Sequence, residues 1–224
     1  MLRIDRRLLF RAFDRGDIRY DEPHVYYVHE LPFCPRRAFF FRVFNARPIK
    51  HELMVLGSIF HASLPQIAKE MEREGMLRSF EVEKPVEVFH NGITIRGHID
   101  VFGTLADGRK AVLEFKFTEG PDLSLRNELH AAYAIQANTY ACMAGADVYY
   151  LVLVSRHSLD VEAHEFEPDE EAYKRVLQKA REIDKCVQDM KIPYGPEYEW
   201  ECASKRFECQ FCIICDKIGR QRKI

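Results

Sequence analysis

The chain has 224 residues, 47% of them hydrophobic, and a formal net charge of -2 at pH 7. This length and composition predict one main globular unit, and the balanced charge excludes a protein that is basic throughout, so any nucleic-acid binding needs a local patch. No apolar run approaches the roughly 20 residues of a membrane-spanning helix, and the charged N-terminus lacks the apolar stretch of a signal peptide, so we expect a cytoplasmic protein.

Residues 1–50 are predicted to be an N-terminal segment rich in arginine. The first arginines favour a solvated helix face, and "YYVHELPFCPRRAFFFRVF" predicts a short extended piece followed by a helix with Pro35 in its first turn. In this second stretch Arg36 and Arg37 lie among phenylalanines, and such a mixture is compatible with either a binding surface or a packed helix.

Residues 51–192 are predicted to be the folded core. A helix with apolar residues at helical spacing ends near Gly75, and Pro65 should kink or divide it. From Phe80 to Phe117 the period changes to two, which predicts an antiparallel meander of three strands. An alanine-rich helix, two strands and a long amphipathic helix follow. This order predicts an α/β or α+β fold with a central mixed sheet flanked by helices, and residues 193–224 are predicted to be an irregular, cysteine-bearing tail.

Two strands of the meander carry charged residues at alternating positions. In the first strand the predicted polar face holds Thr94, Arg96, His98 and Asp100, and the apolar face holds Ile93, Ile95, Ile99 and Val101. In the second strand one face is predicted to hold Val112, Glu114, Lys116 and Thr118, and the other Ala111, Leu113, Phe115 and Phe117.

The turn between these strands decides whether their acids meet, because a shift of one residue moves every side chain to the other face. A three-residue loop over 106–108, with Gly108 in the left-handed conformation, places Asp100 opposite Glu114 and His98 opposite Lys116. A two-residue loop would place Asp100 opposite Phe115 and separate the acids. The glycine at the third loop position favours the first register.

Two adjacent carboxylates on a partly buried face repel each other unless a cation or a proton lies between them. Magnesium or manganese would meet this need, and Lys116 could orient or help deprotonate an attacking water. A metal ion and a lysine placed in this way could hydrolyse a phosphodiester. The alternative is a surface hairpin with exposed ion pairs, each worth at most about 1 kcal/mol.

Three residues outside the hairpin are compatible with the same site. His61 could supply a nitrogen ligand, which suits manganese as well as magnesium. Gln136 and Tyr140 lie four apart, hence on one face of a helix, where they could hold a phosphate or the lysine. Each of these residues alone has an ordinary structural explanation.

Taken in order, "GSIFH", "GHID", "EFK" and "QANTY" resemble the motifs of the RecB-like branch of the PD-(D/E)XK nuclease superfamily. With one cysteine before this series and a group of cysteines after it, the chain resembles the iron–sulfur exonucleases of that branch, above all the CRISPR-associated "Cas four" family, over about residues 26–216.

This resemblance implies a role for each matching residue. Asp100, Glu114, His61 and the backbone carbonyl of Phe115 would be metal ligands, Lys116 the catalytic lysine, and Gln136 and Tyr140 the helical motif that contacts substrate or supports the site. The implied activity is metal-dependent cleavage of DNA, chiefly exonucleolytic on single strands, which trims DNA for insertion into a CRISPR array.

Seven cysteines in a protein expected in the cytoplasm indicate metal or redox chemistry more than disulfides. Cys209, Cys212 and Cys215 have a spacing that lets three thiolates converge on one cluster, and the resemblance nominates Cys34 as the fourth ligand. The family's tail has a longer gap before its last cysteine, so Cys202 is an alternative ligand. A [4Fe-4S] cluster is favoured, and [2Fe-2S] and structural zinc are the alternatives.

Two other functions stay open. One is a stand-alone RecB-like repair nuclease, and the other is an adaptor that binds DNA ends and docks the CRISPR integrase proteins while cutting little. The complete set of Asp100, Glu114 and Lys116 favours the enzyme, because an adaptor has no need of the lysine. Arg36 and Arg37 are candidates for gripping the DNA backbone, although packing against the tail explains them nearly as well.

Overall fold

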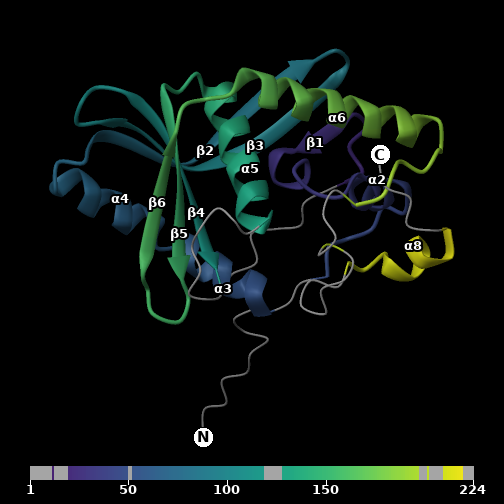
Figure 1. The fold of residues 1–224 in the computed structure, drawn as a ribbon, viewed down its shortest axis with the longest axis horizontal. Coiled ribbons are helices and arrows are strands. Elements are labelled where there is room, and N and C mark those ends of the chain that lie inside the picture. Colours follow the sequence, from purple (N-terminus) through teal and green to yellow (C-terminus); the bar gives the residue numbers. More distant parts are fainter. Residues whose placement is uncertain are drawn as a thin grey trace, which may run out of the picture.

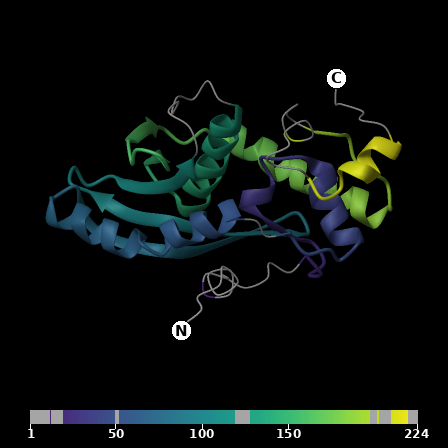
Figure 2. The same cartoon turned by 90° about the horizontal axis from the view of Figure 1, so that it is seen from below.

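The described residues form a six-stranded mixed sheet with helices on both faces, as Figures 1 and 2 show. The computed structural model describes residues 12, 20–49, 52–118, 128–196, 201 and 209–218. The strands are β1 (Val25–Tyr27), β2 (Leu77–His90), β3 (Ile93–Leu105), β4 (Lys110–Thr118), β5 (Val148–Ser155) and β6 (Val161–Phe166). The helices are the 3-10 turn η1 (Val28–Glu30), α2 (Pro35–Val43), α3 (Glu52–His61), α4 (Leu64–Arg73), α5 (Glu128–Ala144), α6 (Glu170–Gln188) and α8 (Cys212–Ile218).

The sheet combines both kinds of strand pairing, which confirms the predicted mixed sheet. The order is β1-β3-β4-β5-β6, with β2 also paired to β3. The meander β2-β3-β4 and the pair β5-β6 are antiparallel, whereas β1 joins β3 and β5 joins β4 in parallel. The pairing of the short strand β1 with β3 was not predicted, because a strand of three residues carries too little pattern to indicate its neighbour.

Apolar residues at alternate positions of the central strands fill a separate core on each face of the sheet. Ala111, Leu113 and Phe115 pack with residues of α4, while Val112 packs with residues of α5 and α6. Strands buried on both faces carry apolar residues almost continuously, as β5 does in "VYYLVLVS". These two layers hold β3 and β4, which carry the candidate site, between α3 and α4 on one side and α5 on the other (Figure 2).

Pro65 divides the first predicted core helix in two, as expected. α3 ends at His61, and α4 begins at Leu64 with Pro65 in its first turn, where a missing backbone N–H is tolerated. The break leaves His61 at the end of α3, beside the sheet. The turn at Asn91 and Gly92, with φ of 48° and 89°, links β2 to β3 as a two-residue hairpin.

Two expectations about local structure are wrong. The strict alternation predicted along β3 breaks at Asp100, because Ile99 packs in the core under α5 and α6 whereas Val101 packs in the core under α4. The tail is also not irregular throughout its described part, since α8 contains Cys212 and Cys215.

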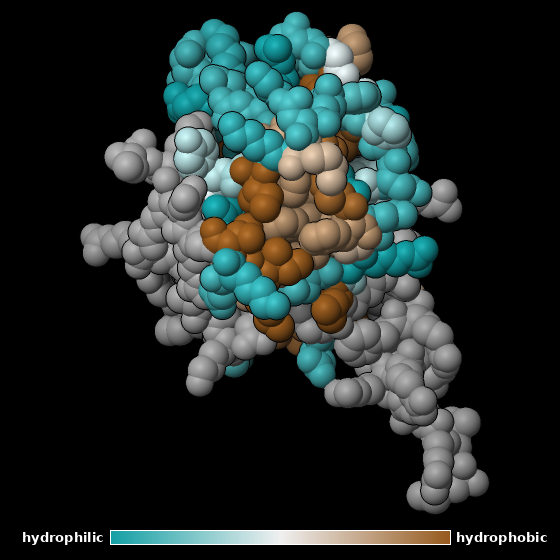
Figure 3. Space-filling model, turned by 90° about the vertical axis from the view of Figure 1, so that its right-hand side faces the viewer, coloured by the Kyte–Doolittle hydropathy of each residue, from teal (hydrophilic) through white to brown (hydrophobic). Residues whose placement is uncertain are grey.

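An aromatic cluster joins the two ends of the described chain. Phe40 and Phe41 of α2 contact Phe211, with ring centroids 5.3 and 5.1 Å away, and Cys215 lies in the same buried cluster. Figure 3, which views this end of the molecule, shows hydrophobic side chains gathered at the surface. Within the part of the chain that the structure describes, no helix is both long and apolar enough to cross a membrane.

Candidate active site

The hairpin that carries the acids has the predicted register. Gly108, with φ of 97°, closes a three-residue loop in which the Leu105 N–H donates to the carbonyl of Arg109 over 2.9 Å. The ladder between β3 and β4 then runs back to the pair Val101–Leu113, one step from Asp100 and Glu114. The predicted turn and register are therefore confirmed as far as the Val101–Leu113 pair, and Asp100 and Glu114 are the next residues of the two strands.

Beyond that pair the two strands separate. The carboxylate of Asp100 accepts the N–H of Phe115 over 2.8 Å and so satisfies a donor that a continued ladder would have used. Lys116 and His98 consequently do not form the predicted cross-strand pair, and His98 is exposed. The separation makes room between β3 and β4 for polar side chains.

Asp100 lies at the centre of a group of potential metal ligands. Its Oδ1 lies 2.9 Å from Nδ1 of His61, and Glu83 Oε1 lies 3.9 Å from the same nitrogen. Ligand atoms of these three side chains all lie within 4.8 Å of one another, which no other trio of histidine, cysteine or acidic side chains does among the described residues. The arrangement suits a hard divalent cation, with two carboxylates and one imidazole available.

Sequence reasoning missed Glu83. It lies on β2 between the residues paired as Val82–Val101 and Lys84–Ile99, and therefore opposite Asp100. The two-residue turn at Asn91 and Gly92 sets this register, so counting back from that turn would have found it. The strand is irregular here, since Glu83 has a φ of 53°.

Glu114 is buried, with one carboxylate oxygen fully engaged. Its Oε1 accepts from Lys116 Nζ over 2.7 Å and from Gln136 Nε2 over 2.8 Å. Its Oε2 is buried and has no hydrogen-bond partner among the described residues. Burial, followed by the nearby charge of Asp100, raises the pKa of Glu114 to about 8. A cation at this free oxygen would supply the partner that the side chain lacks.

The ammonium group of Lys116 contacts both an acid and an aromatic ring. Besides its bond to Glu114, it lies 4.8 Å from the centre of the Tyr133 ring. Burial by itself would lower the pKa of Lys116, but the charges of Glu114 and Asp100 outweigh burial and raise it. Lys116 therefore stays protonated at neutral pH, which favours a role as a cation over the role of a base.

Gln136 and Tyr140 both reach the site from α5 but differ in their contacts. Gln136 bonds to Glu114, whereas Tyr140 is a core residue that packs against Gly97 of β3. A Cβ at position 97 would lie 2.4 Å from the Tyr140 ring, so the glycine of "GHID" is required for close packing of α5 on the strand. Burial and the nearby acids Glu114 and Asp100 raise the pKa of Tyr140 well above its usual value.

The donor set fits a metal ion. His61, Glu83 and Asp100 converge, and Glu114, whose pKa the charges of Asp100 and Glu83 help to raise, has an unpaired buried oxygen. The backbone carbonyl of Phe115, which was also expected to be a ligand, stays a prediction. The contact of Phe115 in the site involves its N–H, which donates to Asp100.

The cysteines of the predicted cluster share a cavity with this site. The cavity has a volume of about 500 Å³ and is lined by Cys34, Cys209, Cys212 and Cys215 as well as by His61, Lys116 and Gln136. Cys202, the alternative ligand, lies outside the described residues. Cys142 and Cys186 do not line this cavity and are half-buried.

Arg36 and Arg37 differ in their placement. Arg36 is 4% exposed, and its Nε donates to the carbonyl of Pro193 over 2.9 Å. This burial favours the alternative of packing against the tail and argues against a contact between Arg36 and DNA. Arg37 is exposed, lines the cavity and lies over the Phe41 ring, so it is still a candidate for a phosphate contact.

Comparisons with known proteins give a likeness of fold. A scan against protein families finds no match, and a search of curated proteins finds no relative. Among solved structures, the protein designated SSO0001 shares 19% identity with a TM-score of 0.65, over 97% of this chain and 95% of its own. An alkaline exonuclease from Laribacter hongkongensis shares 11% identity with a TM-score of 0.50, over 82% of this chain and 93% of its own. The chain therefore has a fold that an exonuclease also has.

We expect Glu83→Gln to weaken the binding of Mn²⁺ by roughly 10-fold or more, because loss of one carboxylate charge removes an ionic ligand. Isothermal titration calorimetry of the protein with MnCl₂ measures the effect. Glu81→Gln is the matched control, since Glu81 lies on the same strand with an exposed side chain that pairs with Lys84. If both variants bind Mn²⁺ with equal affinity, Glu83 is not a metal ligand.

Proposed function

We propose that this protein is a metal-dependent DNA nuclease that acts mainly as an exonuclease on single strands. The observation that carries the proposal is the state of Glu114, which has one oxygen held by Lys116 and Gln136 and the other buried without a partner. The charges of Asp100 and Glu83, which converge with His61, act on this same carboxyl. Support comes from the likeness in fold to an exonuclease with a TM-score of 0.50.

The side chains of the site divide into ligands and residues that act on the phosphate. His61, Glu83, Asp100 and Glu114 would hold Mn²⁺ or Mg²⁺. The bound cation would polarise the phosphoryl oxygen and lower the pKa of the attacking water. Lys116, which stays protonated, is placed to stabilise the negative charge that grows on the phosphate as water adds and the P–O bond breaks. Gln136 orients Glu114, and Tyr140 supports α5 behind the site.

We further propose that Cys34, Cys209, Cys212 and Cys215 hold an iron–sulfur cluster, with Cys202 as the alternative ligand. Support comes from the first four of these cysteines, which line one cavity although Cys34 is far from the other three in the chain. A cluster there would tie the start of α2 to α8 and stabilise the fold as a structural metal does. The motif resemblance favours cytoplasmic processing of DNA ends for CRISPR spacer acquisition, in contact with the integrase proteins.

Two alternatives keep the same fold. A stand-alone repair nuclease would have the same site, and the genes that neighbour this one would separate it from a CRISPR enzyme. A DNA-end-binding adaptor of the integrase would bind DNA but cut little. Lys116 and its bond to Glu114 favour the enzyme, because end binding alone does not need them.

The test is a cleavage assay of the protein purified without oxygen, with labelled single-stranded and duplex DNA in Mn²⁺, Mg²⁺ or EDTA. We expect metal-dependent shortening of the single strand, and its loss in Asp100→Asn. Asp107→Asn is the control, because Asp107 is an exposed residue in the turn of the same hairpin. Binding of DNA ends without cleavage by the wild-type protein would favour the adaptor.

The cluster is tested on the same preparation by its visible absorbance and iron content. Cys34→Ser should lose both, whereas Cys142→Ser, on the half-buried cysteine of α5, should keep them. A zinc content of one atom per chain in place of iron would show that the thiolates hold a structural zinc.

A further inference from the structure

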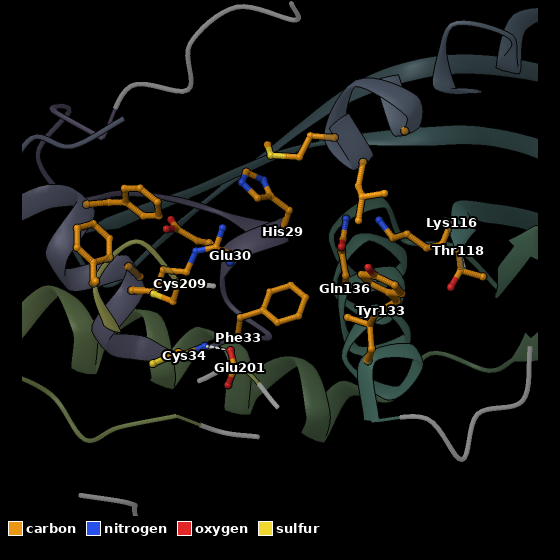
Figure 4. Close-up of a pocket in the computed structure, with 18 of the residues that line it drawn as sticks. His29, Glu30, Phe33, Cys34, Lys116, Thr118, Tyr133, Gln136, Glu201 and Cys209 are labelled. Atoms are coloured by element: carbon orange, nitrogen blue, oxygen red, sulfur yellow. Dashed lines mark hydrogen bonds between the residues drawn. The ribbon is translucent and has the colours of Figure 1, made fainter. Parts of the chain in front are cut away.

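Phe33 occupies the part of the cavity between the cysteines and the candidate active site. Its half-buried side chain lines the same cavity as Lys116, Tyr133 and Gln136. Figure 4 shows its ring pointing toward Tyr133 and Gln136, while Cys34 points the other way. The Phe33 and Tyr133 rings meet edge to face, with centroids 6.3 Å apart. An aromatic face is thus presented to the space in front of Lys116.

The backbone fixes the position of this ring from two sides. The peptide group between Phe33 and Cys34 has its carbonyl bonded to Lys179 Nζ of α6 over 2.6 Å. The N–H of the same peptide donates to a carboxylate oxygen of Glu201 over 2.6 Å. Charge-assisted bonds at both ends hold the peptide plane and therefore the direction in which Phe33 projects.

The cavity around the ring is lined by cationic side chains. Lys116, Arg37 and Arg156 line it. Two acids also line it, but Glu30 is held by Arg42 at 2.6 Å and Glu201 accepts the N–H of Cys34 over 2.6 Å. Burial, together with the positive charges of Arg37 and Lys116, lowers the pKa of His29 in the same wall to about 4. A neutral imidazole and several cations around one space favour an anionic ligand.

The size of the cavity restricts what this ligand can be. The whole cavity, including the end lined by the cysteines, has a volume of about 500 Å³, which lies in the range of sites that bury one small ligand. One unstacked nucleotide with its phosphate fits this description, whereas an intact duplex, whose major groove alone is about 12 Å wide, is too large for it. Aromatic side chains beside cationic ones are the usual means of holding single-stranded nucleic acid, since every base has a face that can stack.

We propose that Phe33 is the stacking surface for one base of single-stranded DNA, which lies in the cavity beside the phosphate that Lys116 contacts. This inference rests on the proposed function for the identity of the ligand. It adds a binding residue that contributes no metal ligand and no charge, and one that accepts any base, because stacking on a flat ring does not read base edges.

The test compares wild-type protein on two sets of single-stranded oligonucleotides in EDTA, so that nothing is cut. One set carries an abasic site at successive positions from the end, and the other carries 2-aminopurine there. We expect one position at which loss of the base weakens binding roughly 5- to 150-fold, the range for one base–aromatic stack. At that position the 2-aminopurine fluorescence should be quenched on binding.

The variant Phe33→Leu should bind the intact strand as weakly as the wild type binds the abasic one, with no further loss on the abasic strand. Phe33→Trp should retain tight binding and quenching. Phe89→Leu is the matched control, because Phe89 is 74% exposed on the β2 strand and does not line the cavity.

The outcomes separate this inference from the proposed function. If abasic sites at all positions bind like the intact strand, the inference is wrong even when the protein cuts DNA. If the abasic effect and quenching are found but no metal supports cleavage, Phe33 is a stacking residue of a binding protein and the nuclease proposal fails. The comparison of intact and abasic strands uses wild-type protein, so it decides the matter even if Phe33→Leu does not fold.

Discussion

Lys116→Ala is expected to reduce the rate of DNA cleavage by roughly 10²- to 10³-fold, the effect of removing one preorganised donor that stabilises transition-state charge. The ammonium lies 2.7 Å from Glu114 and above the Tyr133 ring, so its position is fixed before substrate arrives. Because its pKa is raised, it supplies positive charge across the neutral range. The rate of shortening of a labelled single strand under single-turnover conditions measures this loss.

The variant should still fold, and this makes the result interpretable. Removing the lysine leaves Glu114 with Gln136 as its described hydrogen-bond partner, and a carboxyl with a raised pKa can take up a proton instead of remaining an unpaired buried charge. Thermal unfolding of the variant checks this point. Lys110→Ala, at the exposed start of the same strand, is the matched control. Retained cleavage by a folded Lys116→Ala protein would show that the proposed site is wrong.

Gly97→Ala is expected to destabilise the fold by about 1–3 kcal/mol, the usual effect of inserting a methyl group into a packed core. The added carbon would lie 2.4 Å from Cε1 and 2.7 Å from the hydroxyl oxygen of Tyr140, whose side chain is 3% exposed and cannot swing into solvent. α5 would have to move away from β3, and Gln136 would move with it. Chemical denaturation of the purified variant measures the loss of stability.

Two further variants make this second result specific. In a Tyr140→Leu background the same glycine change should be much less harmful, which gives a coupling energy between the two positions of about 0.5–3 kcal/mol. Gly57→Ala is the opposite control, because nothing lies within 4 Å of the added carbon on α3. It should stabilise the helix by about 0.5–1 kcal/mol. Equal effects of the two glycine changes would contradict the packing argument.

Local signals predicted the hairpin because its geometry depends on few residues. Three loop residues set the register of β3 and β4, and this register places Asp100 and Glu114 one step beyond the Val101–Leu113 pair. The mixed sheet also followed from periodicity and element order. Glu83 was not predicted because it lies on β2, outside the hairpin of β3 and β4, although the turn at Asn91 and Gly92 sets the register of β2 and β3 equally well.

Other features depend on contacts that periodicity does not express. The change of face at Asp100 arises because the strands separate there, and a pattern of alternating residues assumes that they do not. The burial of Arg36 depends on the carbonyl of Pro193, which is 157 positions away in the chain. The role of Gly97 is visible only once α5 lies against β3.

The buried carboxyl of Glu114 links the metal site to the proton concentration. Its pKa rises from an ordinary value of 4.5 to about 8, so without a cation the folded chain binds a proton there more tightly than the unfolded chain. Its contribution to stability is then complete below about pH 4.5 and is lost as pH rises toward 8.

A cation competes with the proton on Glu114, so Mn²⁺ should bind more tightly at pH 8 than at pH 6 and should release about one proton per site at the lower pH. Calorimetric titrations in buffers of different ionisation enthalpy count that proton, and an affinity independent of pH would contradict the linkage. Without a metal ion, ionised Glu114 therefore destabilises the fold in mildly alkaline solution. When the metal ion is bound, the same carboxylate helps to hold it, and this binding stabilises the fold.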